Sequence, residues 1–163
     1  DDQLARMRDR QIAWVPTFAP VQAQVDHADK MAWDKSIVSN LHRILDQHAA
    51  SLQKAAGMGV LIIAGSDAGS YGVPHAEGFL RELELMEQAG LSPLQVINSA
   101  TGVSSNRLGF KEKLGQIQPG FRSRFILTRH SPLERISNLR KSRKIIFDGA
   151  VFETGENADV TGL

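Results

Sequence analysis

Apolar residues recur along much of this chain at the spacing of amphipathic helices. Between residues 29 and 56 they return at steps of three and four, which predicts a helix with one buried stripe. The same spacing predicts a helix over residues 76 to 88. Ser92 followed by Pro93 favours a further helix start, since serine caps helices and proline suits the first helical position. Shorter helices are predicted over residues 2 to 10 and 104 to 108.

Two other runs are apolar at nearly every position. They cover residues 12 to 15, closed by Pro16, and residues 60 to 65. Such runs are typical of strands buried on both faces, as in parallel sheets. Because the long helix lies between them, the order strand, helix, strand predicts a βαβ crossover with two parallel neighbouring strands.

Beyond residue 112 the pattern changes to short β-like runs. They cover residues 125 to 128, 144 to 147 and 150 to 153, and the last two flank Asp148-Gly149, a strong hairpin signal. We therefore divide the chain into an α/β part, residues 1–112, and a small β domain, residues 113–163.

Composition narrows the classes of partner. The chain has 163 residues, 42% of them apolar, which suffices for one domain with a sizeable core. A net charge of +1 gives no broad surface for nucleic acid, and the basic cluster at residues 135 to 144 is predicted to be a solvated loop. The absence of cysteine excludes disulfides and thiolate metal sites. No segment approaches the roughly 20 apolar residues of a membrane span, so we expect no membrane partner and favour the cytoplasm.

Asp67 is the principal candidate for chemistry, because it follows the apolar run at residues 60 to 65. Parallel α/β folds place their chemistry at the carboxyl ends of strands. Gly65 and Gly69 indicate a backbone shaped for close approach. The alternative is a structural aspartate that caps a helix or forms an Asx-turn.

The loop after Asp67 carries two further polar side chains, Tyr71 and His75. His75 is either a substrate contact or a helix-capping residue. The remaining histidines do not pair at the spacing of metal ligands; they are His27, His42, His48 and His130.

Several short motifs occur together in a specific order. They are Val15-Pro16-Thr17-Phe18, residues 59 to 69 with Ser66-Asp67-Ala68-Gly69, His75 followed by Arg81-Glu82-Leu83, residues 89 to 95, and residues 114 to 120. In this order they resemble the C-terminal half of a metal-dependent amidohydrolase, in the branch of imidazolonepropionase-like enzymes and Xaa-Pro dipeptidases. The resemblance implies the last two strands and helices of a (β/α)8 TIM-type barrel, plus part of a small β-sandwich.

The resemblance also implies a reaction: hydrolysis of an amide or other C–N bond by metal-activated water, in a small cyclic amide or dipeptide-like substrate. It implies one or two divalent ions, with zinc expected, and it makes Asp67 a metal ligand that also accepts the water's proton. Tyr71 and His75 would contact substrate. The other metal ligands are expected from an upstream half of the same enzyme or a complementary chain, because this chain corresponds to a stretch that begins just after the sixth strand. Alone, the chain is expected to be inactive.

A different class of function also fits the sequence. The chain could be a non-catalytic, barrel-derived module that binds a small molecule or forms a homo-oligomer and lacks a complete metal site. Asp67 would then be a relic.

Overall fold

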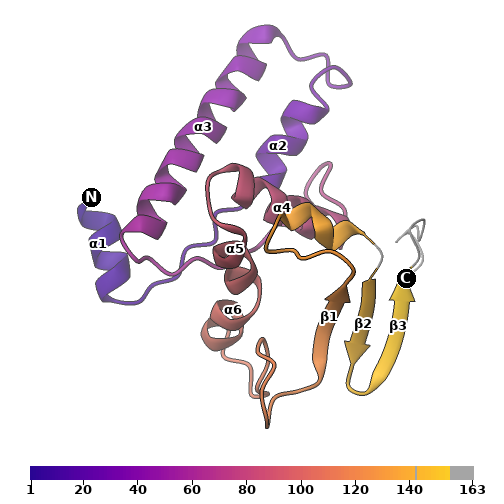
Figure 1. Cartoon of the computed structure of the whole chain (residues 1–163). Coiled ribbons are helices and arrows are strands. Elements are labelled where there is room, and N and C mark those ends of the chain that lie inside the picture. Colours follow the sequence, from indigo (N-terminus) through magenta and orange to yellow (C-terminus); the bar gives the residue numbers. More distant parts are fainter. Residues whose placement is uncertain (142, 155–163) are drawn as a thin grey trace.

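The computed structural model describes residues 1–141 and 143–154, in which helices precede a small antiparallel sheet (Figure 1). The elements, in chain order, are α1 (Asp2–Asp9), α2 (Ala19–Asp26), α3 (Lys35–Gly57), α4 (Glu77–Gln88), α5 (Pro93–Ala100), α6 (Gly102–Arg107), β1 (Arg124–Thr128), the 3-10 helix η1 (Ile136–Arg140), β2 (Arg143–Phe147) and β3 (Ala150–Thr154). No helix among these residues is both long and apolar enough to cross a membrane.

The helices expected from periodicity are present, with ends set by caps. The Asp34 carboxylate accepts hydrogen bonds from the amides of Ser36 and Ile37, at 2.7 and 3.1 Å. Helix α3 therefore begins at Lys35, later than the periodicity alone predicts. Ser92 and Gln95 form a reciprocal capping box that starts α5.

The two apolar runs are parallel neighbours, as predicted, but they form one bridge in place of regular strands. The Trp14 amide donates to the Leu61 carbonyl at 2.8 Å, and the Ile63 amide donates to the Trp14 carbonyl at 2.9 Å. Val60, Ile62 and Ile63 are all buried, so this segment is covered on both faces. Among the described residues the only strand-like pairing of these runs is the Trp14–Ile62 bridge, and the Ala64 amide donates instead to the Ser99 carbonyl at 3.1 Å, so the ladder is short.

The C-terminal strands form an antiparallel sheet in the order β1-β2-β3. Asp148 and Gly149 have φ of 50° and 91°, the left-handed values that a tight hairpin turn requires, and the predicted hairpin is confirmed. Arg124 and Arg122 bind the Asp148 carboxylate at 2.7 and 2.6 Å, and these hydrogen bonds hold the pKa of Asp148 below its usual range.

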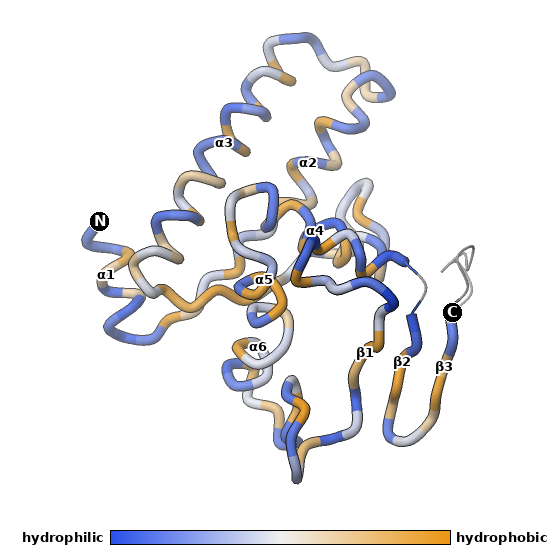
Figure 2. Tube along the Cα trace, in the orientation of Figure 1, coloured by the Kyte–Doolittle hydropathy of each residue, from blue (hydrophilic) through white to orange (hydrophobic). Residues whose placement is uncertain are grey.

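The hydrophobic core lies where α2, α3, α4 and α5 meet the 60–65 segment. In Figure 2 the tube that runs from beside α1 toward α5 is orange, hence apolar, over much of its length. The largest fully buried apolar side chains are Leu52, Met86, Val96 and Ile136.

The prediction of a solvated loop at residues 135 to 144 is wrong. This stretch contains η1, where Ile136 is 1% exposed and packs into the core. Arg140 pairs with Glu84 at 2.5 Å and also with Glu77. Its positive charge is thus engaged by carboxylates of α4, which docks η1 on that helix.

Candidate functional site

The parallel pairing of Trp14 with Ile62 places the carboxyl ends of both apolar runs at one edge. The first run leads into Thr17 and the second into Asp67, and these residues have φ of 57° and 51°. Non-glycine residues seldom adopt this left-handed conformation, and residues held in it cluster at functional sites. Both segments therefore turn sharply at the same edge.

The Asp67 side chain is exposed at this edge. Its Oδ2 atom accepts a hydrogen bond from Ser70 Oγ at 2.6 Å, and the Ser70 amide donates to the Asp67 carbonyl at 3.1 Å. Oδ1 accepts no hydrogen bond from the described residues. The next helix begins at Glu77, so the helix-cap alternative for Asp67 is wrong. One carboxylate oxygen is thus oriented by a turn while the other faces solvent.

Gly65 allows the two segments to approach closely. A Cβ atom on Gly65 would lie 2.7 Å from Val15 Cγ1, closer than such atoms come in proteins. A side chain here would push the two segments apart, two residues before Asp67. The absence of a side chain at Gly65 is therefore what lets the two segments lie close together near Asp67.

Replacing Gly65 tests this close approach. We expect Gly65→Ala to lower the free energy of unfolding by about 1–3 kcal/mol, as overpacking does. Val15→Ala in the same chain removes the clashing atom and should recover most of the loss, measured by denaturant unfolding. The control is Gly57→Ala, since a Cβ there meets nothing within 4 Å. An equal loss of unfolding free energy at Gly57 and Gly65 would contradict the inference that the close approach of the two segments requires glycine at position 65.

Tyr71 and His75 lie on the loop after Asp67, as predicted, but their side chains are not joined to the Asp67 carboxylate. Within the described residues neither makes a hydrogen bond or ion pair with Asp67. The Tyr71 ring is 58% exposed and meets the His27 ring edge-on, with centroids 5.6 Å apart. The His75 side chain does not cap α4; its main-chain carbonyl instead accepts from the Glu77 amide at 2.7 Å.

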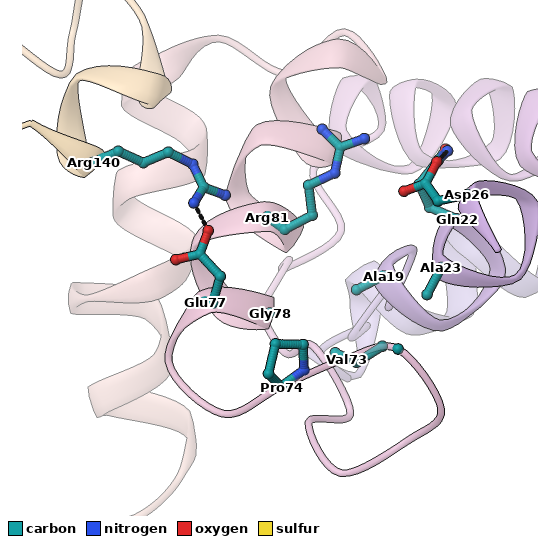
Figure 3. A pocket seen from close by; sticks show the side chains of 11 residues that line it. Ala19, Gln22, Ala23, Asp26, Val73, Pro74, Glu77, Gly78, Arg81 and Arg140 are labelled. Carbon is teal, nitrogen blue, oxygen red and sulfur yellow. Dashed lines mark hydrogen bonds and ion pairs between the residues drawn. The ribbon is translucent and has the colours of Figure 1, made fainter. Parts of the chain in front are cut away.

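A groove of about 270 Å³ opens between α2 and the start of α4 (Figure 3). Val73 and Pro74, from the loop that carries Tyr71 and His75, form part of its wall. Arg81 and Asp26 contribute opposite charges to its rim (Figure 3). The groove therefore adjoins the predicted substrate loop.

Glu82, on α4, is a buried carboxylate that sequence reasoning did not single out as a site residue. It is 0% exposed, and its two oxygens accept hydrogen bonds from the amides of Phe18 and Ala19, at 3.0 and 2.7 Å. Burial raises the pKa of Glu82, while these amides and that of Thr17 oppose the rise. The signal available in the sequence was an acidic residue on the apolar face of a predicted helix.

The described residues do not make a metal site by themselves. No group of three or more histidine, aspartate or glutamate side chains comes together among residues 1–141 and 143–154. Catalytic zinc usually takes three protein ligands. The exposed Asp67 carboxylate has the right donor chemistry for one such ligand. Because the other two ligands are missing from the described residues, these residues alone do not fit a complete zinc centre.

Comparison with known protein families identifies one that covers most of the chain. The family model described as "Amidohydrolase family" matches residues 17–151, well over half of the chain. No curated protein matches the chain significantly.

Solved structures of this type superpose on the chain. A Xaa-Pro dipeptidase with bound methionine in the active site matches with a TM-score of 0.74 and 25% identity, over 94% of this chain and 37% of the dipeptidase. A putative prolidase from Bifidobacterium longum matches with a TM-score of 0.72 and 24% identity, over 86% of this chain and 35% of the prolidase. An A. niger ochratoxinase matches with a TM-score of 0.66 and 24% identity, over 93% of this chain and 36% of that enzyme. The chain thus spans little more than a third of these proteins.

Proposed function

This chain belongs to the amidohydrolase family, and we propose on that premise that it supplies the last part of a hydrolase acting on amide or other C–N bonds. The observation that carries the proposal is the exposed Asp67 carboxylate at the shared carboxyl edge of two parallel segments. A carboxylate in that place, in a chain of this family, is suited to metal binding and proton transfer.

We assign the segments at residues 12–16 and 60–65 to the last two strands of a TIM-type barrel. Their single parallel bridge supports this assignment, as do the intervening helix α3 and the fraction of the relatives that the chain spans. Residues 1–112 then belong to the barrel, and β1, β2 and β3 belong to a small composite β-sandwich that starts near residue 113.

Within this proposal the chain's own residues have separate roles. Asp67 provides one carboxylate to a divalent-metal centre, for which zinc is the expected ion. It also accepts the proton of the attacking water and then passes it to the leaving nitrogen. The metal, when bound, lowers the pKa of water and polarises the scissile carbonyl. Ser70 orients the Asp67 carboxylate through its hydrogen bond to Oδ2, and Tyr71 and His75 contact substrate from the following loop.

The remaining metal ligands come from an upstream half of the enzyme or from a complementary chain. A dipeptide-like substrate is favoured because one similar structure is a Xaa-Pro dipeptidase that holds methionine in its active site. A small cyclic amide is the other substrate class to assay.

Native mass spectrometry with elemental analysis tests the proposal. We expect a particle in which this chain accompanies the upstream segment and carries one or two divalent ions. Chelation should abolish hydrolysis of a panel of Xaa-Pro dipeptides and cyclic amides, and added zinc should restore it. A stable, metal-free assembly of this chain alone that still binds small molecules would instead support the non-catalytic module.

A further inference from the structure

Glu82 connects two parts of the chain that are distant in sequence. It lies on α4, yet its two carboxylate oxygens accept hydrogen bonds from the amides of Phe18 and Ala19, at the start of α2. These residues lie 64 and 63 positions earlier in the chain. Helix α2 has no side-chain cap of its own, since its N-cap is Phe18. The buried carboxylate therefore caps a neighbouring helix, where negative charge is favoured at the amino end.

The residue just before these two amides is in a strained conformation. Thr17 is β-branched and has φ of 57°, a left-handed value that costs non-glycine residues of this kind free energy. Such a conformation persists only where surrounding contacts determine it. The hydrogen bonds from Phe18 and Ala19 to Glu82 are contacts of that kind.

The strained turn lies beside Asp67. Trp14 is bridged to Ile62 in parallel, so Thr17 comes three residues after one partner and Gly65 three residues after the other. Asp67 follows two residues later, and the loop after it leads directly into α4. Glu82 thus links the turn after the first apolar run, at Thr17, to α4, the helix that follows the second apolar run.

We propose that Glu82 is a positioning residue that holds the Thr17–Ala19 turn in its left-handed form, so that this turn makes one wall of the substrate site beside Asp67. This inference rests on the proposed hydrolase function and adds a second residue to its site. It requires the two oxygens of Glu82 to accept from two separate amides. A glutamine would present an NH₂ group to one of these donors and leave it without an acceptor.

The test compares Glu82→Gln with Glu87→Gln. Glu87 is a matched control because it lies on the same helix and also accepts from a backbone amide, that of Ile136, at 3.1 Å. Its contact leads to η1 and not to the edge that holds Asp67. Both variants remove one negative charge from α4. Glu87→Gln keeps a carbonyl oxygen for its single amide donor, whereas Glu82→Gln leaves one of its two amide donors without an acceptor.

Hydrogen exchange gives the first readout. We expect Glu82→Gln to speed exchange of the Phe18 and Ala19 amides by about 10- to 100-fold relative to Glu87→Gln, as loss of a charge-assisted hydrogen bond predicts. Adding Thr17→Gly should restore part of the protection, because glycine adopts positive φ without strain. If Glu82→Gln does not fold, Glu82→Asp, which is one methylene shorter, is measured with the same expected direction.

Steady-state kinetics of the complete enzyme give the second readout. We expect Glu82→Gln to lower kcat by about 100-fold, the effect of a small displacement of a positioned group, while Glu87→Gln changes it little at a similar melting temperature. Unchanged exchange at Phe18 and Ala19, or faster exchange with an unchanged kcat, overturns the proposal.

The exchange measurement needs no turnover, so it separates this inference from the proposed function. Asp67→Asn is expected to leave the exchange of Phe18 and Ala19 unchanged. If Glu82→Gln leaves the exchange of Phe18 and Ala19 unchanged while Asp67→Asn still abolishes turnover, only the inference about Glu82 is overturned.

Discussion

Asp67→Asn in the complete enzyme should lower kcat by about a thousandfold or more, because the variant keeps the shape of the side chain and removes its charge and basicity. The backbone should not move, since asparagine is among the residues that best tolerate the left-handed conformation found at Asp67, φ 51°. The Ser70 hydroxyl can still donate to the amide oxygen of asparagine. We therefore expect the free energy of unfolding to change by less than about 1 kcal/mol.

Steady-state kinetics and denaturant unfolding of the same preparations provide the measurement. Asp46→Asn on α3 is the matched control, an exposed aspartate away from the edge of the two segments, and should leave kcat unchanged. Turnover retained in Asp67→Asn would remove Asp67 from the mechanism. Loss of turnover together with loss of folding would make its role structural.

Leu52→Ala should cause the largest loss of stability, about 2–5 kcal/mol. Leu52 is 0% exposed in the middle of the core between α3 and its neighbours, so removing three carbon atoms leaves a cavity as well as less buried apolar surface. In denaturant unfolding the midpoint should fall while the slope stays the same.

The control for Leu52 is Ile44→Ala on the same helix. Ile44 is 43% exposed, so the same kind of truncation should cost less than about 1 kcal/mol. An equal loss of unfolding free energy at both positions would contradict the assignment of the face of α3 that carries Leu52 as its buried face. It would indicate that another polypeptide covers Ile44.

Local signals were sufficient for much of the fold. The capping box at Ser92 and Gln95 lies within four residues, and the Asp148-Gly149 turn is defined by its own backbone, so both could be predicted from the sequence. The parallel pairing of the two apolar runs followed from their order around α3. The length of the pairing could not be predicted, because the number of hydrogen bonds depends on which strands lie alongside.

Elements that depend on distant partners were missed. Helix α2 has weak amphipathic character, and its start is capped by Glu82 from 63 and 64 residues away. Likewise η1 looked like a charged loop, although Ile136 enters the core and Arg140 pairs with carboxylates of α4. No local pattern shows such contacts, because they exist only once the helices have packed.

The places of the candidate residues in the fold were predicted in outline, while their roles stay predictions. Asp67, its turn and the position of Tyr71 and His75 on the next loop follow from a strand-end argument. The hydrogen bond from Ser70 to Asp67 and the strained Thr17 turn do not, because they depend on side-chain and backbone angles that the sequence does not specify.

The hydrogen bonds of Glu82 have a consequence for the order of folding. Each can form only after some 64 residues of chain have been brought together, and the entropy of closing such a loop is lost before the contact stabilises it. The β2–β3 hairpin, with its two-residue turn, closes within microseconds by comparison. We therefore expect the edge that carries Thr17 and Asp67 to assemble late, after α4 has docked. The part of the chain assigned to chemistry should therefore acquire its structure only after the elements that close locally have formed.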